Sequence, residues 1–388
     1  MLLCFLMKKN THIAHFSLGS NRGNKALMLQ KAIYLLEDRL GSIIAISPVY
    51  KTAAWGFDSE DFLNCCVSIA VTMTPLKVLD TILEIENNLG RKRFEQEGYA
   101  PRTIDIDLLL YGTEIHLDER LQLPHPQMEK RAFVLLPLAQ IAAKAIHPIF
   151  DKSVQSLLNE SEDSSALELT DIVLKKTLSL QDSGLTFIAI EGNIGAGKTT
   201  LSSMISEDFN AKLILEGFAD NPFLPKFYED QARYAFPLEM SFLAERYQQF
   251  TESTSQLDLF KNFMVSDYDI YKSLIFAQIT LGKEEFALYR KLFGFMYQDA
   301  KVPDAYIYLY QNTERLLENI AKRGRDYEKT IDAEYLEKIN QGYLDFIKTH
   351  HQNHQLIIDV SDRDFVSNPE DYQWIIKKIA LFGFLKSR

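Results

Sequence analysis

The sequence predicts two domains, an α+β sandwich followed by an α/β domain built on a parallel sheet. With 388 residues, the chain is too long for one typical hydrophobic core. Its first part alternates strand-like and helix-like segments at lengths typical of a compact sandwich. Its second part repeats short apolar strands between long helical segments, which indicates a parallel sheet covered on both faces.

In the first part, period-two apolar patterns predict strands and helical apolar spacing predicts helices. The segment "PLKVLDTILEIENNLG" (75–90) has the helix signals of proline at its start and glycine at its end. Strands are expected at 12–20, 62–73 and 103–112, and helices at 24–40, 75–90 and 130–142. The first domain is therefore expected over residues 11–158.

The stretch "LLNESEDSSALEL" (157–169) is polar and acidic, and a linker is expected over residues 159–185. The second domain is then expected over residues 186–388. Its strands are predicted at 185–190, 211–217, 262–268, 305–311 and 354–361.

Composition excludes several classes of protein. The formal net charge is −11 and the pI is near 5.3, which argues against a general nucleic-acid binder or an anionic-membrane binder. Three cysteines without metal-site spacing fit a reducing cytosol, and no apolar run approaches the roughly 20 residues of a membrane helix. The opening "MLLCFLMKKN" is apolar and then basic, so it is interpreted as a frayed extension, with Met7 as an alternative start.

A phosphate-binding loop is predicted in the middle of the chain, at "IEGNIGAGKTT" (190–200). It matches the G-x-x-x-x-G-K-T pattern, with a strand before it and a helix after it. Glycines let backbone N–H groups surround phosphate oxygens, Lys198 adds a positive charge, and Thr199 can hold Mg²⁺. The predicted ATP-binding residues are Gly192, Asn193, Ile194, Gly195, Ala196, Gly197, Lys198, Thr199 and Thr200.

Around this loop the sequence resembles the deoxynucleoside kinase family, over about 186–388. The resemblance rests on the loop, on "LEGFADNPFLPKFYED" (215–230) and on "AKRGRDYE" (321–328). It implies that Glu216 takes the proton from the sugar 5′-hydroxyl, and that Tyr228 and Glu328 hold the 3′-hydroxyl. It also implies that Arg323 and Arg325 form a lid over the transferring phosphoryl group.

Two departures from that family bear on activity. The family's Asp/Glu-Arg-Ser triplet aligns with Asp267-Tyr268-Asp269, which keeps an acid for Mg²⁺ but loses the arginine that orients the base. The glutamine that usually contacts the nucleobase aligns with Glu239, so base preference is expected to change. One alternative is therefore a non-catalytic nucleotide-binding or dimerisation module, since the family resembles dimers packed through helices.

The segment "PRTIDIDLLLYG" (101–112) places Asp105 and Asp107 two apart on a predicted strand, so both carboxylates share a face. Paired carboxylates repel unless cations lie between them, which predicts two Mg²⁺ ions. The alternative is a pair of solvated acids on an edge strand. Arg91, Arg93 and Arg102 flank the pair and suit a polyphosphate.

Together with "FSLGSN" (16–21), "PHP" (124–126) and "KRAFVL" (130–135), this segment resembles 6-hydroxymethyl-7,8-dihydropterin pyrophosphokinase over about 12–158. The resemblance implies a ferredoxin-like fold and transfer of pyrophosphate from ATP to the pterin. It gives Arg91 and Arg102 catalytic roles beside the acids. It implies pterin contacts from Thr52, Phe62, Asn64 and Phe133, and ATP contacts from Glu86, Arg91, His125 and Arg131.

The expected protein is a bifunctional cytoplasmic enzyme in which both halves use ATP and Mg²⁺. A ferredoxin-like α+β domain precedes an α/β P-loop kinase domain, and a homodimer through the kinase domain is a further expectation. Small molecules are the expected partners: ATP, hydroxymethyldihydropterin and a deoxynucleoside, with neither nucleic acid nor membrane. A remaining alternative is that the second half alone is active.

Overall fold

The computed structural model describes residues 11–53, 59–91, 102–217, 221–254, 260–298, 300–328, 331–349 and 354–386. The chain divides into two compact units, Met1–Leu178 and Ser179–Arg388. This division falls inside the segment predicted as a linker.

The first unit is built on an antiparallel sheet with the strand order β10-β3-β4-β1-β5, and β2 also pairs with β4. Its strands are β1 (His12–Ser20), β2 (Gly41–Ile46), β3 (Tyr50–Thr52), β4 (Phe62–Val71), β5 (Asp105–Tyr111) and β10 (Glu168–Leu169). Two small hairpins lie outside this sheet and comprise β6 (His116–Leu117) with β7 (Gln122–Leu123), and β8 (Ile146–His147) with β9 (Lys152–Ser153).

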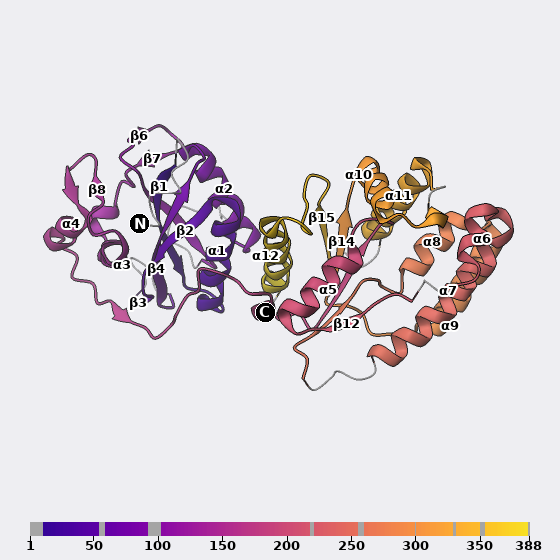
Figure 1. Cartoon of the computed structure of the whole chain (residues 1–388). Coiled ribbons are helices and arrows are strands. Elements are labelled where there is room, and N and C mark those ends of the chain that lie inside the picture. The colour runs from indigo at the N-terminus through magenta and orange to yellow at the C-terminus, as the bar shows by residue number, and fades with distance from the viewer. Residues whose placement is uncertain are drawn as a thin grey trace. The chain divides into compact units, whose positions relative to one another are not determined.

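The described helices of this unit pack on the sheet or on one another. They are α1 (Lys25–Arg39), α2 (Pro75–Asn88), α3 (Ala132–Ala142) and α4 (Val154–Glu160). Helices α1 and α2 pack together on one side of the sheet, and α3 and α4 pack together on the other (Figure 1). The three strands and three helices predicted for this part of the chain are all present, and the structure adds the short strands.

The predicted linker contributes to the first unit. Strand β10 pairs with β3, and Thr170 donates a backbone hydrogen bond of 3.0 Å to the carbonyl of Val49. Further along, Gln30 on α1 exchanges two hydrogen bonds of 2.8 Å with the backbone of Lys175. Residues 168–175 are therefore attached to the sheet and to α1.

The second unit is an α/β domain with a five-stranded parallel sheet in the order β12-β13-β11-β14-β15. Its strands are β11 (Phe187–Gly192), β12 (Lys212–Ile214), β13 (Met264–Ser266), β14 (Ala305–Tyr310) and β15 (Gln355–Asp359). Each lies within a segment predicted as a strand or overlaps it by most of its length, so the prediction of a parallel sheet is confirmed.

Helices surround this sheet (Figure 1). They are α5 (Lys198–Phe209), α6 (Leu224–Glu229), α7 (Gln231–Thr254), α8 (Lys272–Thr280), α9 (Lys283–Met296), α10 (Thr313–Arg323), α11 (Ala333–Thr349) and α12 (Pro369–Lys386). Short 3₁₀ turns occur at Met128–Lys130 in the first unit and at Leu180–Ser183 and Asp326–Glu328 in the second. None of the helices in the described ranges is long and apolar enough to cross a membrane.

Candidate active sites

The phosphate-binding loop begins where the fully buried strand β11 ends. Gly195 and Gly197 have φ angles of +82° and +88°, a region that residues with a side chain rarely adopt. A Cβ atom on Gly197 would also lie 2.8 Å from the ring of Phe365. The loop then enters α5 at Lys198, where the first N–H groups of the helix have no partner within the helix. This geometry suits an anionic ligand.

Side chains from elsewhere in the unit hold the loop in this shape. The amide of Asn193 donates to the carbonyl of Leu336 and to Oδ1 of Asn340, both at 2.8 Å. Asn319 donates to the carbonyl of Gly195 at 2.9 Å. Lys198 donates to the carbonyl of Asn193 at 2.9 Å, and burial together with the charge of Lys272 lowers the pKa of Lys198 to about 8.

Asp267 joins the loop to Glu216. Its Oδ2 accepts a hydrogen bond of 2.5 Å from the hydroxyl of Thr199, and its Oδ1 accepts one of 2.7 Å from the backbone N–H of Glu216. Strands β12 and β13 are adjacent and parallel, so their carboxyl ends bring these residues together. The two predicted Mg²⁺ ligands, Thr199 and Asp267, are therefore in contact, and their oxygen atoms are of the type that Mg²⁺ prefers.

Glu216 is held by two cations that the sequence analysis did not identify. Its Oε1 accepts a hydrogen bond of 2.9 Å from Nε of Arg246 and lies 2.7 Å from Nη2 of the same residue, and its Oε2 lies 2.5 Å from Nζ of Lys272. All three side chains are at least nine-tenths buried. Burial alone would raise the pKa of Glu216, but Lys272 and Arg246 lower it to about 2. Glu216 is therefore a fixed carboxylate at neutral pH.

Tyr268, which replaces the arginine of the family triplet, lies in the hydrophobic core. It is fully buried and packs edge-on against Phe250, with ring centroids 6.4 Å apart. Its hydroxyl has no hydrogen-bond partner within the part of the chain that the structure describes. The arginine is absent from the triplet, as the sequence indicates, but Arg246 on α7 and Lys272 on α8 place two positive charges against Glu216.

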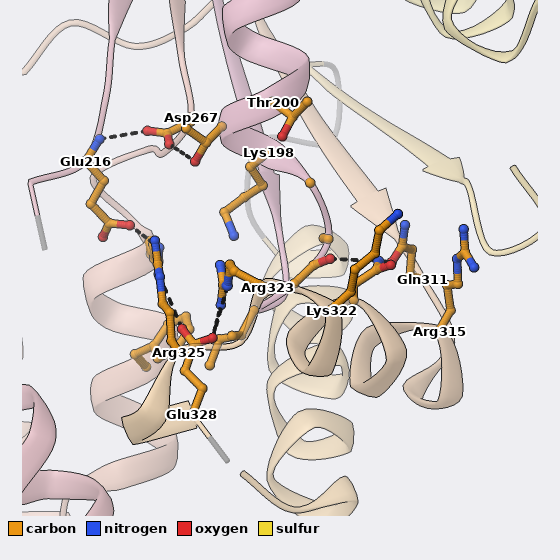
Figure 2. A pocket seen from close by; sticks show the side chains of 18 of the residues that line it. Lys198, Thr200, Glu216, Asp267, Gln311, Arg315, Lys322, Arg323, Arg325 and Glu328 are labelled. Atoms are coloured by element: carbon orange, nitrogen blue, oxygen red, sulfur yellow. Dashed lines mark hydrogen bonds and ion pairs between the residues drawn. The ribbon is translucent and has the colours of Figure 1, made fainter. Parts of the chain in front are cut away.

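The predicted lid residues meet the predicted sugar-binding residue. Glu328 accepts hydrogen bonds from Arg323 (3.0 Å from Nε) and Arg325 (3.3 Å from Nη1). Figure 2 shows Glu328 between these arginines, with Lys198, Glu216 and Arg323 directed toward the same space. Tyr228 lines the same cavity and packs edge-on against Phe227 at 5.5 Å, so it belongs both to the cavity wall and to the core boundary.

These groups line one cavity of about 570 Å³. An aromatic and aliphatic wall comprises Leu224, Phe227, Tyr228, Leu238, Phe242, Phe276 and Tyr335. Glu239 is set into this wall on α7, is only 2% exposed, and accepts a hydrogen bond of 3.0 Å from Thr280. The cavity therefore combines a cationic, phosphate-binding part with flat apolar surfaces suited to a ring system.

In the first unit, Asp105 and Asp107 share one face of β5, as the two-residue spacing predicts. The antiparallel register places Asp105 opposite Gly19 and Asp107 opposite Ser17 of β1. Asp105 forms ion pairs with Arg91, at 2.5 Å, and with Arg102. Asn21 fixes Arg102, because its Oδ1 accepts a hydrogen bond of 2.7 Å from the N–H of Arg102 and its own N–H donates one of 3.1 Å to the carbonyl of Arg102.

Among the described residues, Arg131 and Arg102 favour the ionised form of Asp107 but do not outweigh its burial. Burial, reinforced by the charge of Asp105, raises the pKa of Asp107 to about 7. A bound cation would favour the ionised form of both carboxylates and offset their mutual repulsion. Within the described residues, no cluster of three or more histidine, cysteine or acidic side chains could hold a metal ion by itself. Two carboxylates with ligand and water oxygens are nevertheless the usual donor set for Mg²⁺ at a polyphosphate, so the residues fit the predicted ions.

The predicted pterin residues line a small cavity beside the acids. Asn64 donates a hydrogen bond of 2.8 Å to the hydroxyl of Thr52, and both residues are buried. Phe62 and Phe133 line the same cavity, which measures about 80 Å³. A Cβ atom on Gly19 would lie 2.9 Å from Oδ1 of Asn64, so a glycine at this position leaves room for that amide.

The predicted ATP-contacting residues of this unit occupy different environments. Glu86 is 2% exposed and accepts a hydrogen bond of 2.8 Å from the N–H of Ile106, and it pairs with Arg91. It therefore positions Arg91 at the wall of a second cavity. His125 lines that cavity, and burial followed by the charge of Arg131 lowers the pKa of His125. The guanidinium of Arg131 lies 5.7 Å from the ring centroid of Phe133.

Several expectations lie outside the described residues. These are the opening segment with Met7, and Arg93 beside the acidic pair. Sequence reasoning also missed supporting residues that the structure reveals, such as Asn21, Arg246 and Lys272. A signal existed for Arg246, because it follows Glu239 by seven residues on a helix and so lies on the same face.

Comparisons with known proteins agree with this division. The family model "Deoxynucleoside kinase" matches residues 188–382, and "7,8-dihydro-6-hydroxymethylpterin-pyrophosphokinase (HPPK)" matches residues 15–143. Deoxyguanosine kinase of Bacillus subtilis (strain 168) is 39% identical over 193 residues, which cover 49% of this chain and 93% of that protein. The 2-amino-4-hydroxy-6-hydroxymethyldihydropteridine pyrophosphokinase of Aquifex aeolicus (strain VF5) is 39% identical over 148 residues, which cover 38% of this chain and 91% of that protein.

Among solved structures, deoxyadenosine kinase from M. mycoides with bound dATP aligns with a TM-score of 0.44 and 24% identity, over 50% of this chain and 98% of that chain. The two family models occupy separate parts of the sequence, and each sequence relative is covered almost completely. The chain therefore belongs to two families, the hydroxymethyldihydropterin pyrophosphokinases through its N-terminal half and the deoxynucleoside kinases through its C-terminal half.

Proposed function

We propose that the chain carries two ATP-dependent transferase activities. The N-terminal half transfers pyrophosphate from ATP to the hydroxymethyl oxygen of 6-hydroxymethyl-7,8-dihydropterin, and AMP leaves. The C-terminal half transfers the γ-phosphoryl group of ATP to the 5′-hydroxyl of a deoxynucleoside, and ADP leaves. Membership of the two families supports these reaction classes, and the arrangement of side chains supports the roles below.

For the N-terminal activity, the observation that carries the proposal is the shared face of Asp105 and Asp107 next to Phe62 and Phe133. The two carboxylates would hold Mg²⁺, which neutralises charge on the triphosphate when it is bound. The phenyl rings provide flat walls for a bicyclic ring, and the amide of Asn64 offers both a donor and an acceptor to its edge. A ferredoxin-like fold is part of this proposal.

The products distinguish pyrophosphate transfer from other uses of ATP. The full chain is incubated with ATP, MgCl₂ and 6-hydroxymethyl-7,8-dihydropterin, and nucleotides are separated by ion-exchange chromatography. Pterin-dependent AMP supports the proposal, whereas pterin-dependent ADP or no reaction contradicts it. Asp107→Asn keeps the side-chain volume but removes the charge, so AMP release is expected to fall by about 1,000-fold or more.

For the C-terminal activity, the observation that carries the proposal is the position of Glu216. Its carboxylate is fixed between Arg246 and Lys272 and lines the same cavity as the phosphate-binding loop. A carboxylate that is ionised at all physiological pH values accepts a hydrogen bond from the 5′-hydroxyl and orients it toward phosphorus. Its low basicity suits phosphoryl transfer, in which positioning and charge stabilisation dominate. Thr199 and Asp267 would hold Mg²⁺, and Lys198, Arg323 and Arg325 would balance charge on the transferring group.

The alternative for this half, a non-catalytic nucleotide-binding or dimerisation module, rested on the missing arginine at Tyr268. The two cationic partners of Glu216, Arg246 and Lys272, support the catalytic function instead. Incubating the full chain with ATP and each of the four deoxynucleosides separates the two functions. Deoxynucleoside-dependent ADP supports the kinase, and ATP binding without any turnover supports the module.

A further inference from the structure

The cavity of the second unit contains a buried carboxylate that the proposed phosphoryl transfer does not use. Glu239 lies on α7 and is 2% exposed, yet it lines the cavity together with Phe227, Leu238 and Phe242. Glu216, the carboxylate expected to bind the 5′-hydroxyl, lines the same cavity. A ring system that stacks on the apolar wall would therefore place its polar edge near Glu239.

The hydrogen bonding of Glu239 is incomplete. Its Oε2 is buried without a hydrogen-bond partner among the described residues, and its Oε1 contacts the hydroxyl of Thr280 at 3.0 Å. The same hydroxyl lies 2.9 Å from the carbonyl of Phe276 and carries a single hydrogen atom. Thr280 can therefore donate to only one acceptor at a time, Oε1 of Glu239 or the carbonyl of Phe276. A buried carboxyl oxygen without a hydrogen-bond partner costs free energy of folding unless a bound ligand forms a hydrogen bond with it.

Both protonation states of Glu239 are accessible near neutral pH. Burial raises the pKa of Glu239 to about 7, although Arg246 on α7 and Lys272 on α8 favour the charged form and Glu216 opposes it. Tyr289 from α9 donates to the backbone carbonyl of Glu239 at 3.4 Å, and Tyr335 from α11 lines the same cavity as Glu239. Burial raises the pKa of both tyrosines above their ordinary value, so they stay neutral.

The two forms of a carboxyl group match different nucleobases. A carboxylate presents two acceptors, which match the adjacent N1–H and N2–H donors of guanine. A neutral carboxyl group presents one acceptor and one donor, which match the N6–H donor and the N1 acceptor of adenine. We propose that Glu239 determines which purine the acceptor site takes, with its carboxylate selecting guanine and its neutral form selecting adenine. This inference rests on the proposed deoxynucleoside kinase function.

The test compares kcat/KM of the full-length protein for deoxyguanosine and deoxyadenosine between pH 5.5 and 8.0. If each form of Glu239 accepts one base, kcat/KM for deoxyguanosine divided by kcat/KM for deoxyadenosine follows the ratio of carboxylate to neutral acid. This quotient is then expected to rise about tenfold per pH unit. Glu239→Gln carries a fixed donor and acceptor, as the neutral acid does. This variant is expected to retain turnover of deoxyadenosine and to lose at least about 100-fold in its relative preference for deoxyguanosine, independently of pH. Glu245→Gln, which changes an exposed residue of the same helix, is the matched control and keeps the wild-type profile.

The outcomes separate this inference from the function beneath it. An active Glu239→Gln variant with the wild-type base ratio and pH dependence overturns the inference and leaves the kinase function intact. A wild-type protein that phosphorylates no deoxynucleoside refutes the kinase function and the inference with it. If the Glu239→Gln variant is inactive but still binds ATP, the wild-type protein provides the test. A wild-type ratio of kcat/KM for deoxyguanosine over deoxyadenosine that does not change with pH also overturns the inference.

Discussion

The cluster of Glu216, Arg246 and Lys272 makes a prediction about both stability and catalysis. Its carboxylate has a pKa of about 2 instead of its ordinary 4.5. A difference of that size corresponds to about 3 kcal/mol of stability at pH 7. Because the folded-state pKa is lowered, this contribution is complete above about pH 5 and is lost as the pH falls toward 2.

Glu216→Gln removes the charge at nearly constant volume and leaves two buried cations without their anion. The free energy of unfolding of the second unit is expected to fall by about 3 kcal/mol at pH 7. The difference from the wild-type protein is expected to shrink to about 1 kcal/mol at pH 3, because the glutamate of the unfolded chain, with its ordinary pKa of 4.5, is then mostly protonated while the folded-state carboxylate is still mostly ionised. Deoxynucleoside-dependent ADP formation is expected to fall by about 100-fold or more, while pterin-dependent AMP formation is unchanged.

Hydrogen exchange in increasing urea, analysed by peptide mass spectrometry, separates the units because peptides from β11 and β14 report the second unit alone. Glu229→Gln, at an exposed position at the end of α6, is the control and is expected to change neither quantity. Wild-type stability and turnover in Glu216→Gln would refute both the charge cluster and the role of Glu216. A stability loss that does not shrink at low pH would refute the electrostatic explanation.

Three further substitutions have clear expectations. Tyr268→Arg places a charge in an aromatic core, so it is expected to destabilise the second unit by more than about 3 kcal/mol and not to raise turnover. An increase in kinase activity would contradict the role given to Arg246 and Lys272. Gly197→Ala forces a left-handed residue against Phe365, and the KM for ATP in the kinase assay is expected to rise at least about tenfold. Phe62→Ala removes a cavity wall, so the pterin KM is expected to rise about tenfold with the ATP KM unchanged in assays of AMP release.

Segments with a strong local pattern were predictable from the sequence. Strand β1 coincides with the predicted 12–20, and α2 begins at its proline as predicted. Strand β2 was missed because "GSIIAI" follows α1 directly and its short apolar run has no turn of its own. Strand β10 has two exposed residues in an acidic stretch, so only its pairing with β3 makes it a strand. Such pairing depends on the tertiary structure and leaves little trace in local sequence.

The same distinction applies to the sites. The glycines and Lys198 of the phosphate-binding loop act as neighbours in sequence, so a motif identifies them. The charges around Glu216 come from two helices that begin far apart in the chain, and Tyr268 suggested that one of them was missing. The unpaired oxygen of Glu239 could also not be inferred from sequence, because burial and Thr280 together define it.

One measurement tests the central claim, that the chain holds two separate active sites, most directly. Pterin-dependent AMP and deoxynucleoside-dependent ADP are measured side by side for the full-length wild-type protein, Asp107→Asn and Glu216→Gln. The wild-type protein is expected to form both products, Asp107→Asn to form only ADP, and Glu216→Gln to form only AMP. A wild-type protein that lacks either product, or a single substitution that abolishes both, would contradict the claim.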